Sequence, residues 1–470
     1  MHKKQALVLF CCGPWLLGGC AARRYHSAPI VPAETASRLQ ARNLGDPGLR
    51  TFLEKNGHTF IAWPPTPWNL EMLSLAALYF NPTLDAARAR VAGTQAAVIS
   101  AGARPNPSLG LSPGIPSPYL FSLDVTVPVE TANKRGHRIQ IARNLNEAAR
   151  FDLADSAWKV RTGVRGALLN YFLASRNLEG LHSEEQVRRA QVKILEERLA
   201  VGEIPRPELD AARIELAKTQ LAITTAEGQI AQSKAALAAS IGIPVSGLQD
   251  FEFSWPDLNS PPTPESFSPQ TIQRDAVLNR LDVRRSLAEY TAAEADLQLE
   301  IAKQYPDIQI GPGYTYEEGN NFFTIGLSMT LPLFNRNQGP IAEAEARRKE
   351  SGAAFLVTQA QVIAQSEQAY ASYKAGLKEL VEADQSLRNL QDTQLQMMQH
   401  AVSAGEADQL ALNGLQLQAI AVTRARLDAL SRAQNALGAL EDAVQRPLDP
   451  DDAFPFNLDS LNKIPAESNQ

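Results

Sequence analysis

Cysteine is scarce in this chain, and its three copies all lie near the amino terminus. Cys11 and Cys12 fall in a segment that we expect to be removed, which leaves Cys20 as the only thiol of the mature protein. A framework of disulfides is therefore excluded, although the compartment that we predict would allow one.

Long apolar runs are also missing. Beyond the amino-terminal segment, no stretch reaches the roughly 18 consecutive apolar residues that a membrane-spanning helix needs. If the chain crosses a membrane, the sequence predicts that it does so with strands.

Metal and catalytic patterns are absent as well. Ser112 lies in a literal match to the Gly-x-Ser-x-Gly pattern of hydrolases, but near an expected hairpin tip and not at a strand-to-helix elbow. The histidines show no ligand spacing such as His-x-x-x-His. We therefore predict no enzyme activity, no metal site and no cofactor. The histidines are His2, His26, His58, His137, His182 and His400.

The formal net charge is −6, and it becomes more negative when the two lysines of the amino-terminal segment are lost. An acidic chain is a poor ligand for the phosphate backbone, so we predict no nucleic-acid partner.

The first 19 residues have the pattern of a secretory signal peptide, with basic residues followed by an apolar run from Ala6 to Leu17. The ending Leu17-Gly18-Gly19-Cys20 is similar to the bacterial lipobox, which implies a lipid on Cys20. An ordinary signal peptide with an incidental cysteine is the alternative. Residues 20–68 are rich in proline and are expected to form a lipid-anchored, extended arm.

The rest of the chain contains an internal repeat, 69–243 and 280–447. Each half is predicted to form a helix, two strands, a long helix, a turn and a second long helix. In the first half, Asn81-Pro82 predicts a helix start. A proline-rich linker or equatorial element is expected at 244–279, and a polar tail at 448–470.

The long helices are expected to form hairpins that turn at Gly202 and Gly405. Apolar side chains recur every seven residues in each half, which predicts a coiled-coil seam. A plain antiparallel coiled coil without a transport role is the alternative interpretation of these helices. The seam residues are Leu209, Leu216, Ile223, Ile230 and Leu237 in the first half and Leu430, Leu437 and Val444 in the second.

The strands alternate between apolar and polar residues in the hairpins 107–129 and 306–333, with Val125 and Leu327 among the apolar positions. Open strand edges are costly in a bilayer, and four strands cannot close into a barrel. Three copies would supply twelve strands. A soluble, half-buried sheet is the alternative.

The chain resembles an outer-membrane efflux factor of the TolC family. The resemblance rests on Asn81-Pro82-Thr83-Leu84, on the Pro-Asn-Pro of 105–107, on the two turn glycines and on the strand exit from Leu331 to Gly339. It implies a mainly α fold with a small β part, in which long coiled-coil hairpins and four amphipathic strands per protomer form a TolC-like α/β-barrel. A homotrimer would build a 12-stranded barrel in the outer membrane of a Gram-negative bacterium, and a tunnel in the periplasm.

The resemblance also implies partners and a role. A periplasmic adaptor (membrane fusion protein) and an inner-membrane resistance-nodulation-division (RND) pump would dock on the trimer, which would be a passive exit duct. The strand exit is similar to that of members of the cobalt-zinc-cadmium type, which implies heavy-metal cations as substrates. Drugs or other organic substrates are one alternative, and a non-conducting structural or adaptor coiled-coil lipoprotein is another.

Two sets of residues are candidates for function in such a duct. Acidic side chains near the turns would constrict its periplasmic entrance, although Ala411 and Gly414 stand where the second repeat of the family carries its gate, and these acids could be helix starts only. Polar positions of the strands would line the barrel. The gate candidates are Glu203, Glu208, Asp210, Glu406 and Asp408, and the lumen candidates are Ser122, Asp124, Thr126, Thr324, Ser328 and Thr330.

Overall fold

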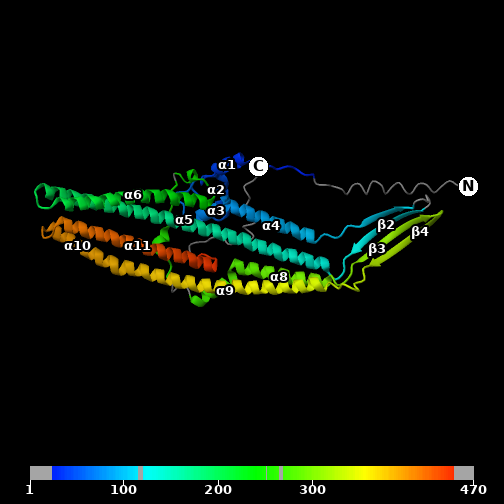
Figure 1. Ribbon diagram of the computed structural model, residues 1–470. Helices are drawn as coiled ribbons and strands as arrows, with labels where there is room; N and C mark the ends of the chain where they lie inside the picture. Colours follow the sequence, from blue (N-terminus) through cyan, green and yellow to red (C-terminus); the bar gives the residue numbers. More distant parts are fainter. Residues whose placement is uncertain (1–23, 115–119, 250, 264–267, 449–470) are drawn as a thin grey trace. The chain divides into compact units, whose positions relative to one another are not determined.

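The computed structural model describes residues 24–114, 120–249, 251–263 and 268–448 (Figure 1). Cys20, the expected signal peptide and most of the expected tail lie outside the described residues. The chain divides into two units after Ala41. The first unit contains α1 (Pro32–Gln40), and the elements below belong to the second unit.

The helices of the first repeat begin and end at the signals seen in the sequence. Asn81 caps α4 by accepting a hydrogen bond from the amide of Thr83, with proline at the first helical position, as predicted. The hairpin turns at Gly202, whose φ of +75° lies in the left-handed region. The bounds are α3 (Leu70–Phe80), α4 (Pro82–Ala101), α5 (Lys134–Ala200) and α6 (Arg206–Ile241).

The second repeat follows the same plan with one difference. Gly405 forms the turn with a φ of +74°, as predicted. However, a π-helical turn at Ala383–Arg388 interrupts the long helix that precedes this turn and divides it into α9 and α10. Nothing in the sequence pattern predicted this interruption. The bounds are α8 (Leu281–Ala302), α9 (Gln338–Glu382), α10 (Asn389–Ser403) and α11 (Gln409–Val444).

The segment that we expected to be an extended arm contains the helices α1 and α2 (Pro47–Lys55). Asp46 accepts hydrogen bonds from two amides at the start of α2, and Pro47 occupies its first position. Proline therefore starts these helices where we expected it to prevent them. The proline-rich element at 244–279 contains η1 (Val245–Leu248), η2 (Pro256–Asn259) and α7 (Pro269–Asn279).

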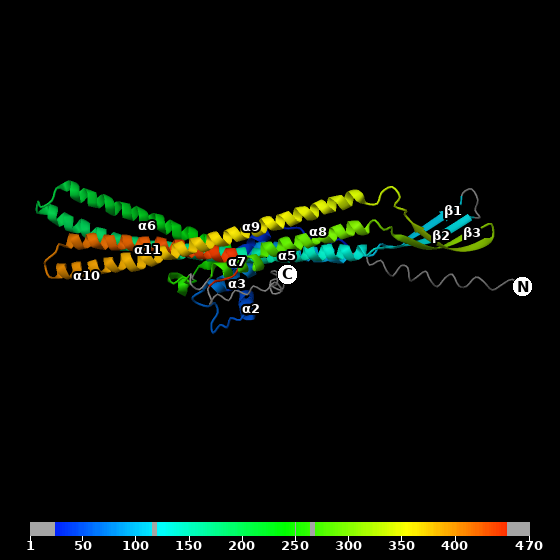
Figure 2. The ribbon, with the colours of Figure 1, turned by 90° about the horizontal axis from the view of Figure 1, so that it is seen from below.

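The two helical hairpins lie side by side (Figure 2), with α5 packed against both α6 and α11. The predicted seams are buried at Leu209, Ile223 and Leu237 in the first hairpin and at Leu430 and Leu437 in the second. Between these positions lie Ala212, Thr219 and Ala226, and their small side chains let the helices approach closely.

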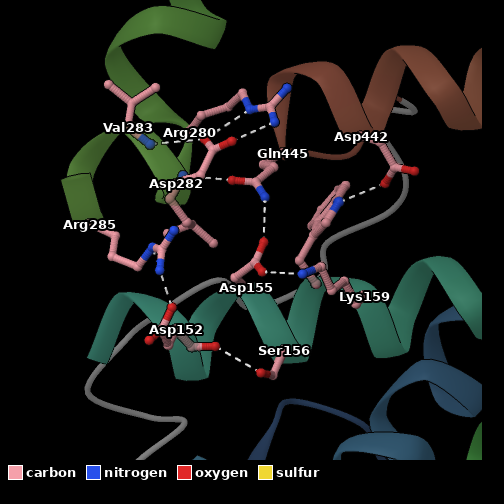
Figure 3. A network of polar contacts seen from close by, with 12 residues as sticks. Asp152, Asp155, Ser156, Lys159, Arg280, Asp282, Val283, Arg285, Asp442 and Gln445 are labelled. Atoms are coloured by element: carbon pink, nitrogen blue, oxygen red, sulfur yellow. Dashed lines mark hydrogen bonds and ion pairs between the residues drawn. The ribbon is translucent and has the colours of Figure 1, made fainter. Parts of the chain in front are cut away.

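Short helices stack end to end on the long hairpins. Gly242, with a φ of +91°, ends α6 against Asn81 at the start of α4. Gln445 takes the same left-handed conformation at the end of α11, with a φ of +49°. Its side chain accepts a hydrogen bond from the Leu281 amide at 2.6 Å and donates one to Asp155 at 2.9 Å (Figure 3). These contacts offset the strain of a non-glycine residue in this conformation.

The strands of both repeats form one antiparallel sheet in the order β1-β2-β3-β4. Tyr314 lies opposite Leu123 on one side and Phe323 on the other, so odd positions of β2 share a face with even positions of β3 and odd positions of β4. β4 ends four residues before the expected residue 333. The bounds are β1 (Ser108–Pro113), β2 (Leu120–Val129), β3 (Ile308–Glu317) and β4 (Asn320–Met329).

A buried polar network joins the two repeats where α5 crosses α11. Glu441 lies 3.1 Å from Arg161 and 3.4 Å from Arg165, and all three side chains are at most 6% exposed. Arg165 also donates to the side chain of Gln434, which donates in turn to the carbonyl of Leu258 in η2. The network therefore fixes both repeats and the element between them.

Tyr373 lies beside this network on α9 and is fully buried. Its hydroxyl donates a hydrogen bond to the carbonyl of Pro262. Burial raises the pKa of the Tyr373 hydroxyl, so it stays a neutral donor.

Candidate functional site

The polar face of the sheet carries most of the predicted lumen residues. Cross-strand pairing places Asp124 level with Thr324, and Ser122 hydrogen-bonds with Thr315 at 3.4 Å. The residues facing these side chains are small. A side chain at Gly110 would collide with the Asp124 carboxylate, and one at Gly313 would collide with Thr324. Glycine therefore leaves space for a polar lining on this face. The predicted residues that lie on it are Ser122, Asp124, Thr126, Thr324 and Ser328.

Thr330 is the predicted lumen residue that does not lie in a strand, because β4 ends at Met329. Among the residues that the structure describes, no strand pairs with residues 330–333.

The opposite face of the sheet is apolar and exposed. Leu109, Phe323, Ile325 and Leu327 are between 63% and 86% exposed. Val125 lies on the same face, opposite Leu109. Such a continuous exposed apolar face marks a contact with lipid or with another protein.

The turns of the two hairpins are joined by an ion pair that the sequence did not reveal. Arg198, in the last turn of α5, contacts both carboxylate oxygens of Asp408 at 2.7 and 2.8 Å. The hydrogen bond from Arg198 lowers the pKa of Asp408. Asp408 therefore stays ionised at neutral pH, and the pair is lost only as the pH falls through this lowered pKa.

Asp408 also starts a helix, which is the alternative role that we considered for the acidic residues near the turns. It is the N-cap of α11 and accepts a hydrogen bond from the amide of Leu410 at 3.2 Å. Leu410 in turn packs on Leu195 and Leu209 of the first hairpin. The second turn is thus tied to the first by one ion pair and one apolar cluster.

The other gate candidates lie around these turns but do not gather at one point. Glu203 lies 3.9 Å from Arg198, and Asp210 lies 3.8 Å from Arg206. Glu208 lines a groove of about 660 Å³ between α5, α6 and α11. Glu406 is exposed in the second turn. Arg198 is the residue that brings gate candidates from both turns together, since it contacts Glu203 of the first turn and Asp408 of the second.

The polar cavity at the junction of α5, α8 and α11 measures about 470 Å³. Asp155 contacts Lys159 at 2.6 Å, Asp152 lies 3.5 Å from Arg285, and Asp442 accepts from Trp158 (Figure 3). Because these carboxylates have partners within the protein, the cavity is a structural junction. In the described ranges, no group of three or more His, Cys, Asp or Glu side chains could hold a metal ion.

Within the part of the chain that the structure describes, no helix is long and apolar enough to span a membrane.

The fold is that of the TolC-like outer membrane channels. The outer membrane protein VceC of Vibrio cholerae matches 81% of this chain and 97% of its own, with a TM-score of 0.65 and 22% identity. CusC matches 83% of this chain and 95% of its own, with a TM-score of 0.65 and 19% identity.

The sequence agrees with this class of fold. The family described as outer membrane efflux protein matches residues 73–243 and 273–444, which correspond to the two repeats and cover well over half of the chain. This chain belongs to that family.

Three proteins with known roles are similar to this chain at low sequence identity. The cobalt-zinc-cadmium resistance protein CzcC of Cupriavidus metallidurans is 26% identical over 282 residues, which cover 59% of this chain and 66% of CzcC, just under two thirds. The nickel-cobalt-cadmium resistance protein NccC of Alcaligenes xylosoxydans xylosoxydans is 25% identical over 69% of this chain and 74% of its own. The pyoverdine export outer membrane protein OpmQ of Pseudomonas aeruginosa is 24% identical over 57% of this chain and 62% of its own.

Proposed function

We propose that this chain forms a homotrimeric outer membrane channel, the passive exit duct of a tripartite efflux system that exports heavy-metal cations. The observation that carries the proposal is the family match over both repeats, on a fold with one polar and one apolar sheet face. The apolar face would contact lipid and the polar face would line a twelve-stranded barrel. An adaptor and an RND pump would dock at the hairpin turns.

The metal substrate is supported by the two metal-resistance relatives, CzcC and NccC. Selection of the metal would belong to the pump, because a duct needs no dedicated binding site. An organic substrate is the second candidate, and the similarity to the pyoverdine exporter OpmQ supports it.

Expression of this chain in a Gram-negative host that carries a matching pump and adaptor but lacks its own channel tests the proposal. Restored tolerance to cobalt, zinc and cadmium ions would support metal export, and restored secretion of an organic siderophore would support the second candidate. Reconstituted protein that conducts no ions in planar bilayers would favour a structural coiled-coil lipoprotein instead.

The anchor at Cys20 is a further part of the proposal. Cys20→Ala is expected to abolish labelling by radioactive palmitate, because it removes the only thiol of the mature chain. The barrel is expected to insert all the same, as its strands do not include this residue. Equal labelling of the variant and the natural chain would contradict the anchor.

The acidic residues near the turns are proposed to form the periplasmic entrance. In a trimer each acid occurs three times around the axis. Carboxylates that point toward the axis would lie within a Debye length of about 8–10 Å at ordinary salt and would concentrate cations. A divalent cation is therefore expected to bind there and obstruct the flow of ions.

Neutralising the acids is expected to weaken this block. We expect the concentration of a divalent cation that halves the current of single trimers to rise by about tenfold, with lower cation selectivity. Asparagine at 408 keeps the N-cap acceptor while removing the charge, so α11 should still begin at the same residue. The substitutions are Glu203→Gln, Glu208→Gln, Asp210→Asn, Glu406→Gln and Asp408→Asn.

Glu379→Gln is the matched control, because Glu379 is exposed and pairs with Arg432 away from the turns. It should leave the block unchanged. If the fivefold variant assembles and conducts but is blocked like the natural chain, the acids serve only to start helices.

A further inference from the structure

A cavity of about 550 Å³ lies where β2 passes into α5. Val127 and Val129, near the end of β2, line one part of it, and the first turns of α5 line another. Arg104, from the linker between α4 and β1, and Arg135 of α5 also line the cavity. It therefore joins the end of the sheet to the start of the helices, and it lies far from the hairpin turns in the sequence and in the fold.

The acidic groups at this cavity have partners within the protein. Glu130 accepts two hydrogen bonds from the guanidinium group of Arg138. Asp307 lies 2.6 Å from the ammonium group of Lys134, whose side chain is only 8% exposed. These four charges cancel in pairs, so they leave no negative charge for the other basic residues of the cavity.

Two guanidinium groups remain without a counter-charge. In the described ranges, no carboxylate lies within ion-pair distance of Arg104, which is exposed, or of Arg135, which is half-buried. Arg135 donates through Nε to the carbonyl of Gly102 at 2.6 Å, which orients the group and leaves its terminal nitrogens for another acceptor. The cavity thus has an excess of positive charge, and its electrostatic complement is an anion.

The wall beside these arginines is apolar. Val127 and Val129 alternate with Pro128 and share their face of the sheet with Val125, which lies opposite Leu109. Their side chains are 40% and 42% exposed. The cavity therefore lies at the end of the exposed apolar face. A ligand that combines a negative group with apolar chains matches both parts of it.

Exposed aromatic side chains lie at the same level of the fold. The carbonyl of Tyr305 accepts a hydrogen bond from Lys134 at 2.6 Å, and the Tyr305 residue is 60% exposed. Phe334 follows β4 as Glu130 follows β2, three residues before an asparagine with left-handed backbone, and it is 98% exposed. Aromatic residues are enriched where hydrocarbon meets the headgroups of a membrane. This level of the fold therefore suits a layer of headgroups.

We propose that the cavity binds the headgroup phosphate of an anionic phospholipid in the inner leaflet of the outer membrane. Arg104 and Arg135 donate hydrogen bonds to the phosphate oxygens, and the acyl chains lie along Val127 and Val129. This deepens the proposed function, because it rests on insertion of the sheet with the helices on the periplasmic side. A phosphate held by both arginines also ties the linker before β1 to the start of α5.

Native mass spectrometry of delipidated trimers in detergent, titrated with dioleoylphosphatidylglycerol, tests the site. The natural protein is expected to retain up to three lipids, one for each chain. Arg104→Gln combined with Arg135→Gln should weaken binding by about 25-fold, because each basic residue near an anionic lipid contributes about fivefold. Glutamine at 135 keeps a donor for the Gly102 carbonyl, and the mass itself shows whether the variant is still a trimer.

Two further variants control for charge and position. Arg104→Lys keeps the positive charge and should retain most of the binding. Arg143→Gln removes an exposed arginine from the same helix, about 12 Å further along its axis than Arg135, and should leave binding unchanged. Phosphatidylcholine with the same chains should bind more weakly than phosphatidylglycerol, because its quaternary ammonium group cancels the charge of the phosphate.

The outcomes separate this inference from the proposed function. Trimers of the double variant that bind phosphatidylglycerol like the natural protein overturn the site and leave the channel standing. So do natural trimers that bind phosphatidylcholine equally well, or that exchange the lipid for inorganic phosphate. A protein that remains monomeric and does not insert in outer membranes overturns the proposed function and this inference with it.

Discussion

Leu327→Arg is expected to prevent trimer formation in the outer membrane, whereas Ser328→Arg should be tolerated. Leu327 lies on the exposed apolar face of β4, opposite Ile310, and Ser328 lies on the polar face, opposite Gln309. An arginine on the lipid face near the middle of a bilayer costs about 2–4 kcal/mol, and a trimer would pay this three times. The measurement is the amount of trimer in outer membrane fractions.

A second pair of variants shows whether the effect depends on the face of the sheet, and not on the choice of strand or on the introduction of arginine as such. Val125→Arg and Thr126→Arg test the same alternation in β2, where Val125 shares the apolar face with Leu109. Arginine at 126 would meet the small residues of the polar face and project toward water. If the even positions block assembly and the odd positions do not, the apolar face is not the lipid face.

The sequence predicted this alternation because the period of two is a local property. The same is true of the turns at Gly202 and Gly405 and of the helix start at Asn81, where one residue carries the signal. Repetition in both halves supported the predictions of the strands and of the two turns. The order of the long helices and strands, the coiled-coil seams and the polar strand face were predictable in this way.

Features that depend on contacts between residues far apart in the sequence could not be predicted from it. Arg198 and Asp408 are separated by 210 positions, and a basic residue in the last turn of a helix is expected from the helix dipole alone. The left-handed Gln445 was missed because glycine is the usual residue at such a helix end. The end of β4 was misjudged because the residues beyond Met329 have the alternation of a strand but pair with no strand in the described part of the chain.

Glu441→Leu is expected to destabilise the folded chain more than any other change considered, by about 3–5 kcal/mol. The carboxylate lies between Arg161 and Arg165, and leucine would leave both guanidinium groups buried without their shared counter-charge. The Glu441 carboxylate also accepts a hydrogen bond from the amide of Leu448 at 3.1 Å. The loss is measured as the unfolding free energy of the purified protein in detergent, by denaturation with urea.

Two controls separate charge from shape. Glu441→Gln keeps an acceptor for the Leu448 amide but removes the charge, so it should lose most of the same stability if the buried ion pairs matter most. Glu379→Gln breaks the exposed pair with Arg432 and should leave the unfolding midpoint unchanged. Because α5 belongs to the first repeat and α11 to the second, the Glu441 variants should also expose the junction of the repeats to protease. A Glu441→Leu protein as stable and as resistant as the Glu379→Gln control would show that apolar packing alone holds the repeats together.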